Sequence, residues 1–151
     1  MRIGVIGCGT IARAAVEGIV DDGHEITVSE RSVHHASSLA DAHSNVRIAD
    51  NQGVVDASDV LFLGLMAEHA ADVLGPLTFR DGQVAITFMA GASLEQADAL
   101  VRPARATAQM MPFPGIARGG TPIMTYGDAR LVTEIFGARN SVFCVRDADE
   151  M

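Results

Sequence analysis

Short apolar runs alternate along the chain with stretches in which apolar residues recur every three or four positions. Continuous apolar runs predict strands buried on both faces, and the longer period predicts helices. We therefore expect strands at residues 2–7, 25–29, 46–49, 60–66, 84–89 and 104–110. Helices are expected between them, at residues 11–20, 33–42, 51–57, 67–74 and 94–101.

The last third of the chain has a different pattern. Prolines and glycines are frequent in residues 111–120, which predicts an ordered loop. A strand is expected at 121–125, and Pro122 should place it at an edge of the sheet because proline has no N–H to donate. A helix at 128–136, a strand at 141–145 and a polar tail at 146–151 complete the chain.

This alternation predicts an α/β fold. Strands separated by helices pair in parallel and bring helices to both faces of the sheet. We expect a Rossmann-type, doubly wound, mostly parallel sheet of six parallel strands, plus one or two extra edge strands. The chain has 151 residues, and 48% of them are hydrophobic, as expected for one globular domain.

The net charge, the cysteine content and the length of the apolar runs argue against several kinds of partner and location. The formal net charge is −8, and nucleic-acid-binding proteins are more often basic, so we expect no nucleic-acid partner. Cys8 and Cys144 have neither metal-ligand nor disulfide spacing, which indicates a reducing, cytoplasmic location. No apolar run approaches the roughly 20 residues of a membrane span, so we expect no membrane partner.

A glycine-rich motif lies between the first strand and the first helix. It fits the pattern G-x-G-x-x-A with Gly7-Cys8-Gly9-Thr10-Ile11-Ala12. Gly7 permits the tight turn, Gly9 lets the backbone approach a pyrophosphate, and Ala12 lets the helix pack closely on the sheet. We expect Gly7, Gly9, Thr10 and Ile11 to bind the phosphates of NAD(P)H at the helix N-terminus.

The second strand ends in Ser29, Glu30, Arg31 and Ser32, where a dinucleotide-binding domain contacts the adenosine ribose. Glu30 can accept a hydrogen bond from the 2′-hydroxyl of NAD. Arg31 and Ser32 can bind the 2′-phosphate of NADP. The choice of cofactor stays open, with NADH expected to bind at least as well as NADPH.

Small residues follow the fourth and fifth strands. We expect Gly64, Leu65, Met66, Ala90 and Gly91 to leave room for the nicotinamide ribose, because ligands bind at the carboxyl ends of parallel strands. Close packing of helix on strand explains small residues equally well. For Cys8 we favour a small side chain that fits the turn over a redox-active thiol, and for His69 a surface position. No metal site and no catalytic acid or base is assigned.

The chain resembles the N-terminal domain of pyrroline-5-carboxylate reductases. The resemblance runs through Ile3–Gly9 with Ala12 and Arg13, Val28–Ser32, Ala57–Leu63, Ala90–Glu95 and Met111-Pro112. It implies an NAD(P)H-dependent oxidoreductase that transfers hydride to a small cyclic imine, as in proline biosynthesis. The alternatives are the cofactor domain of a related hydroxyacid or deazaflavin-dependent NADP oxidoreductase, and a non-catalytic nucleotide-binding module.

The sequence departs from this family at several positions. Glu30 replaces an Asn, Met66-Ala67 replaces a Lys-Pro pair, and Met111-Pro112-Phe113-Pro114 lacks the family's Asn. We assign residues 1–145 to the NAD(P)-binding domain and 146–151 to a tail, where the family's all-helical domain would begin. The resemblance implies a homodimer only if that helical domain exists, and little activity for this chain alone.

Overall fold

The computed structural model describes residues 1–30 and 33–151, and its centre is one mixed sheet. The strand order is β3-β2-β1-β4-β5-β6-β7-β8. Strands β1 to β6 are parallel, β7 runs antiparallel to β6, and β8 is parallel to β7. The strands are β1 (Arg2–Ile6), β2 (Glu25–Ser29), β3 (Val46–Ala49), β4 (Val60–Leu63), β5 (Val84–Thr87), β6 (Arg105–Met111), β7 (Pro122–Gly127) and β8 (Ser141–Cys144).

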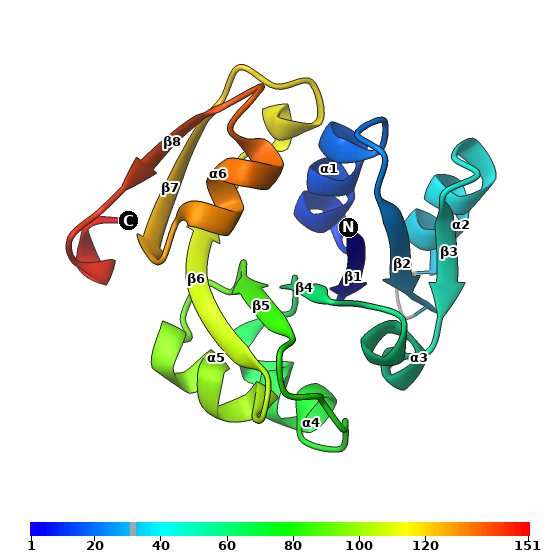
Figure 1. Ribbon diagram of the computed structural model, residues 1–151, viewed down its shortest axis with the longest axis horizontal. Helices are drawn as coiled ribbons and strands as arrows, with labels where there is room; N and C mark the ends of the chain where they lie inside the picture. The colour runs from blue at the N-terminus through cyan, green and yellow to red at the C-terminus, as the bar shows by residue number, and fades with distance from the viewer. Residues whose placement is uncertain (31–32) are drawn as a thin grey trace.

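Helices cover both faces of this sheet (Figure 1). Helices α1, α2 and α6 contribute to one apolar core, and α3, α4 and α5 contribute to the other. The expected doubly wound, mostly parallel fold is thus confirmed. The helices are α1 (Thr10–Ile19), α2 (Val33–Ala42), α3 (Asn51–Asp56), α4 (Ala70–Leu74), α5 (Leu94–Val101) and α6 (Arg130–Phe136), with single turns η2 (Ala67–His69), η3 (Pro114–Ala117) and η4 (Ala148–Glu150).

Strand β4 lies at the centre of the sheet and is buried on both faces. All four of its residues are buried, as its continuous apolar run predicts. The Phe62 ring lies 5.2 Å from that of Phe88 and 5.7 Å from that of Phe136, measured between centroids. Phe136 belongs to α6, so this aromatic contact joins the last helix to the centre of the Rossmann core.

The expectation that Pro122 lies on an edge strand is wrong. Strand β7 is interior, between β6 and β8, and β8 forms the edge. The ladder between β6 and β7 ends at the pair Met111 and Met124, so it does not reach Pro122. As the first residue of its strand, Pro122 breaks no hydrogen bond to β6.

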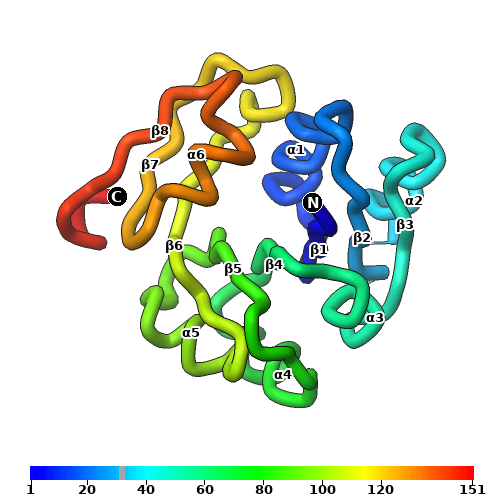
Figure 2. Tube along the Cα trace, in the orientation of Figure 1, coloured from blue at the N-terminus to red at the C-terminus, as the bar shows by residue number. Residues whose placement is uncertain are grey.

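The segment after β6 is more regular than the expected loop. Strand β6 continues to Met111, and residues 114–117 form the turn η3, which packs on α1. A Cβ built on Gly18 of α1 would lie 2.4 Å from the carbonyl oxygen of Ile116. The missing side chain therefore lets η3 approach α1 closely, and Ile116 is 1% exposed. The tube in Figure 2 shows this segment crossing beside α1.

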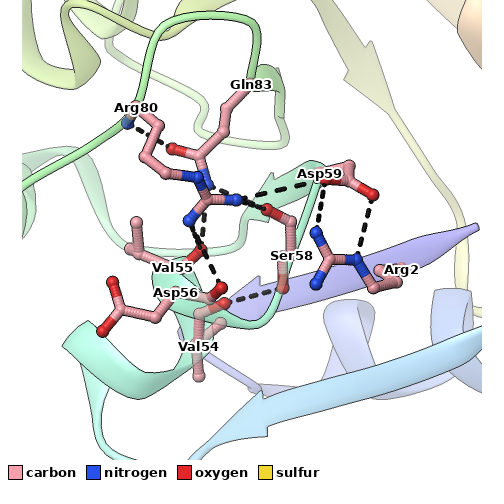
Figure 3. Close-up of polar contacts among 8 residues, drawn as sticks. All are labelled: Arg2, Val54, Val55, Asp56, Ser58, Asp59, Arg80 and Gln83. Carbon is pink, nitrogen blue, oxygen red and sulfur yellow. Dashed lines mark hydrogen bonds and ion pairs between the residues drawn. The ribbon is translucent and has the colours of Figure 1, made fainter.

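A hydrogen-bonded network closes the amino ends of the central strands (Figure 3). The Arg80 guanidinium donates to the carbonyls of Val55 and Ser58 at 3.2 and 2.9 Å. Gln83 donates to the same two carbonyls, both at 2.8 Å. These bonds tie the segment before β5 to the end of α3 and to the residues that precede β4. The network is structural, because ligands of parallel sheets bind at the opposite, carboxyl ends.

No helix in the described part of the chain is long and apolar enough to cross a bilayer.

Candidate functional site

The turn between β1 and α1 requires glycine at its first position. Gly7 has a φ of +84°, a conformation that side chains rarely adopt. A Cβ there would lie 2.9 Å from the carbonyl carbon and oxygen of Gly64. The Gly9 N–H donates to the Gly7 carbonyl at 3.0 Å, which closes the turn. Gly7 therefore determines the conformation of the turn that forms part of the site.

Gly9 has a different role from Gly7. It is the N-cap of α1 with a φ of −81°, and no side chain caps the helix there. A Cβ on Gly9 would have no heavy atom within 4 Å, so the backbone faces open space. The first N–H groups of a helix have no helical partner. Together with the helix dipole, these groups make the start of α1 suitable for an anionic phosphate.

A cavity of about 330 Å³ opens beside this turn. We call it the crevice. It is formed by the glycine-rich turn and by segments at the carboxyl ends of β4, β5 and β6, and within residues 1–30 and 33–151 its lining side chains are uncharged. The lining residues are Gly9, Thr10, Ile11, Ala12, Gly64, Leu65, Phe88, Met89, Ala90, Gln109, Met110, Met111, Pro112 and Met151.

Most of the predicted pyrophosphate and nicotinamide residues come together in the crevice. Those that line it are Gly9, Thr10, Ile11, Gly64, Leu65 and Ala90. Met66 is 65% exposed and lies outside that lining. Gly91 has a φ of +84° and lines a separate groove between α4 and α5. The cofactor contacts of all these residues stay predictions.

The predicted ribose segment lies at the carboxyl end of β2. Ser29 is fully buried, and its hydroxyl accepts a hydrogen bond from the Gly7 N–H at 3.0 Å. Glu30 follows directly and is exposed to solvent. Arg31 and Ser32 lie outside the described residues. The structure thus ties the glycine-rich turn to β2 through Ser29, and Glu30 is the next residue along the chain.

One wall of the crevice consists of residues that the sequence does not assign as cofactor contacts. It comes from the carboxyl ends of β5 and β6, and Gln109 fixes it by donating to the carbonyls of Met89 at 2.9 Å and Ala92 at 3.3 Å. Ligands bind at the carboxyl ends of parallel strands, a rule that we applied to the fourth and fifth strands. Applied to the sixth strand as well, the same rule would have predicted this wall. The residues concerned are Phe88, Met89, Gln109, Met110, Met111, Pro112 and Met151.

Gly64 illustrates close packing at the site. A Cβ on Gly64 would lie 2.5 Å from the Gly7 carbonyl oxygen and 3.0 Å from the Ala12 Cβ. Close approach between β4 and the turn before α1 therefore accounts for the small residue, even though Gly64 also lines the crevice.

The chemistry of the nearby titratable groups is limited. Cys8 is fully buried, and this burial raises the pKa of its thiol to about 11. Such a thiol is inert, so its environment fits the interpretation of Cys8 as a small side chain within the turn. His69 lies in η2, half-exposed, with its Nε2 3.7 Å from a Glu68 carboxylate oxygen. Among the described residues, no group of three or more histidine, cysteine or acidic side chains is arranged to hold a metal.

Comparisons with known proteins agree with the fold and with the family resemblance. A pyrroline-5-carboxylate reductase of Corynebacterium melassecola is 32% identical over 79 residues, which cover 50% of this chain and 29% of that protein. The structure of 1-pyrroline-5-carboxylate reductase from Streptococcus pyogenes matches 99% of this chain and 60% of its own, with 26% identity and a TM-score of 0.80. An imine reductase from Aspergillus terreus shares the fold, at 18% identity and a TM-score of 0.74, over 95% of this chain and 54% of that one.

The resemblance to pyrroline-5-carboxylate reductases is thus confirmed, although the chain spans only 29% and 60% of the length of these two reductases. Residues 2–91 match the family described as NADP oxidoreductase, coenzyme F420-dependent. This match covers more than half of the chain and includes the glycine-rich turn and the ends of β2, β4 and β5. The chain therefore belongs to this NADP oxidoreductase family.

Proposed function

We propose that this chain is the cofactor-binding domain of an NAD(P)H-dependent reductase that acts on a small cyclic imine. The observation that carries the proposal is the start of α1. There an uncapped helix N-terminus and an open Gly9 backbone face a crevice whose described side chains are uncharged. This arrangement suits a ligand with a pyrophosphate at one end and a flat, weakly polar ring at the other.

The residues of the chain bind and orient the cofactor. The N–H groups at the start of α1 hold the pyrophosphate, and the uncharged wall that includes Met89 and Met110 excludes water from the ring. NAD(P)H supplies a hydride when bound, so the protein's part is placement. Among the residues that the structure describes, the crevice lining contains no side chain suited to general acid or base catalysis at neutral pH.

The proposed substrate is inferred from the names of the relatives. Pyrroline-5-carboxylate is the compound in the name of two of them, and it is a cyclic imine. We expect little turnover by this chain alone, because an imine needs further protein walls to be held in the reactive geometry. Correct positioning of the reactants can lower the activation barrier by roughly 7–11 kcal/mol. Dimerisation would likewise require the helical domain that the family resemblance implies. For the cofactor, we propose that NADH binds at least as well as NADPH.

The substitution Gly9→Val tests cofactor binding. The φ of −81° suits any residue and a Cβ meets no atom within 4 Å, so the variant should fold normally. Its branched side chain would occupy the place of the phosphates, and we expect the Kd for both cofactors to rise at least tenfold in calorimetric titration. Ala57→Val is a matched control, since Ala57 is an exposed residue beside the amino ends of the strands. Equal affinities of wild type and Gly9→Val would overturn the proposal.

A further inference from the structure

A second cavity, of about 570 Å³, adjoins the crevice across Thr10. We call it the arginine cavity. It lies between α1, α2 and η3, and Thr10 lines both it and the crevice. The side chains that matter to its chemistry are Arg13, Glu17 and His35, with Arg118 on the far wall. A dinucleotide whose pyrophosphate rests on the start of α1 would therefore have this cavity next to it.

Arg13 is held in place by two helices. Its Nε donates to a Glu17 carboxylate oxygen at 2.9 Å, along α1. One terminal nitrogen lies 3.2 Å from the His35 Nδ1, and the other donates to the Ser38 hydroxyl at 3.1 Å, both on α2. A guanidinium has five N–H groups, so these contacts leave donors for a ligand. The side chain is preorganised, which lowers the entropy cost of binding.

Arg118 reaches the same cavity from the opposite side. It follows η3, is exposed, and forms no ion pair within the part of the chain that the structure describes. The turn that carries it is fixed, because Ile116 is buried against Gly18 of α1. The position of the Arg118 backbone is thus set relative to Arg13, while its charge remains available.

The charge of the arginine cavity contrasts with that of the protein. The chain carries a formal net charge of −8, yet the described lining of this cavity has two arginines and a single carboxylate, Glu17. Paired guanidinium groups are suited to phosphate, which they bind through charge-assisted hydrogen bonds. A phosphate group is therefore the ligand that best matches the lining.

We propose that the arginine cavity binds the 2′-phosphate of NADPH, with Arg13 and Arg118 as specificity-determining residues. This inference rests on the proposed cofactor binding. It assigns the 2′-phosphate to α1 and η3, in addition to the segment after β2. Glu17 neutralises one of the two arginines, and the remaining positive charge of the cavity offsets the repulsion of the exposed Glu30, so NADPH remains a usable second cofactor beside NADH.

Arg118→Gln provides the test, because removing an exposed side chain without an ion pair leaves the fold intact. We expect the Kd for NADPH to rise about tenfold in calorimetric titration at low salt, with the Kd for NADH unchanged. Arg47→Gln is the matched control. It removes the same charge from a cavity of about 340 Å³ at the amino ends of the strands, and both Kd values should stay at the wild-type level.

Competition with inorganic phosphate distinguishes a cavity that binds the 2′-phosphate of NADPH from one that binds free phosphate. If the cavity takes the 2′-phosphate, inorganic phosphate raises the apparent Kd of wild type for NADPH more than sodium chloride of equal ionic strength, and leaves that for NADH unchanged. An unchanged NADPH affinity in Arg118→Gln would overturn the inference, as would equal losses for both cofactors. Binding of inorganic phosphate that NADPH does not displace would assign the cavity to free phosphate and also overturn it. Failure of wild type to bind either cofactor would instead contradict the proposed function.

Discussion

The hydroxyl of Ser29 accepts a hydrogen bond from the backbone N–H of Gly7 at 3.0 Å. This contact joins the end of β2 to the turn that follows β1. Ser29 is fully buried, so we interpret it as a positioning residue that acts on a bound cofactor through the turn. One side chain thus connects the segment predicted to bind the ribose with the turn predicted to bind the pyrophosphate.

Replacement of Ser29 by alanine should weaken both the fold and the site. The Gly7 N–H would lose its partner in a partly buried place, which typically costs about 1–3 kcal/mol of unfolding free energy. We expect a several-fold higher Kd for NADH, because the turn is less well fixed. Urea unfolding and calorimetric titration measure the two effects.

Ser58→Ala is the control for this prediction. Ser58 is also fully buried, and its hydroxyl donates to the Val54 carbonyl at 2.7 Å, at the amino ends of the strands (Figure 3). This variant should lose stability while its cofactor affinity stays unchanged. If both serine variants bound NADH equally well, Ser29 would have no positioning role.

Gly64→Ala adds only one methyl group but should clearly lower the stability of the fold. The added methyl would lie 2.5 Å from the Gly7 carbonyl oxygen, and backbone on both sides cannot move aside cheaply. Overpacking of this kind typically costs about 1–3 kcal/mol. Thermal unfolding should show a clear fall in Tm for Gly64→Ala and almost none for Gly9→Ala, where a Cβ meets open space. A similar Tm for the two variants would contradict the close packing at Gly64.

Much of the fold is predictable from local pattern. The apolar run of β4 predicts a strand buried on both faces, and Ser93 and Gln96 predict the start of α5, where both hydrogen bonds of a capping box are present. The glycine motif predicts its own turn, since Gly7 does adopt a positive φ. In each of these cases the residues that determine the structure are neighbours in sequence.

The β6 wall of the crevice depends on contacts that are distant in sequence. Ala85 of β5 pairs with Ala106, but the next residue, Ile86, pairs with Ala108, so β6 has an extra residue at 107. Consequently Ala106 and Ala108 pack into cores on opposite faces, although residues two apart in a regular strand share a face. Simple alternation therefore gives no reliable orientation for Gln109.

The two cysteines should differ sharply in reactivity. Cys144 is exposed, whereas Cys8 is buried with a pKa raised to about 11, so Cys8 stays protonated at any pH well below that value. We expect a thiol reagent at pH 8 to modify one thiol per folded chain and two in urea. Modification of Cys8 in the folded protein, prevented by NADH, would instead indicate a reactive thiol in the turn.

Glu30 is the residue for which the family resemblance and the charge argument disagree about the cofactor. The family is described as an NADP oxidoreductase, yet an exposed carboxylate directly follows β2, where the ribose of a dinucleotide lies. A carboxylate accepts a hydrogen bond from a 2′-hydroxyl and repels a 2′-phosphate. We therefore expect wild type to bind NADH at least as well as NADPH.

Glu30→Asn should shift the ratio of the two affinities toward NADPH by roughly tenfold, which corresponds to about 1.4 kcal/mol. The substitution removes the charge and one methylene of an exposed side chain, so the Tm should not change. Because Glu30 is exposed, the shift should shrink as salt is added, and both cofactors must be titrated against both proteins at one ionic strength. A wild-type preference for NADPH that Glu30→Asn leaves unchanged would mean that Glu30 points away from the ribose. The arginine cavity would then determine the cofactor without opposition, and Arg118→Gln would be expected to reverse the preference.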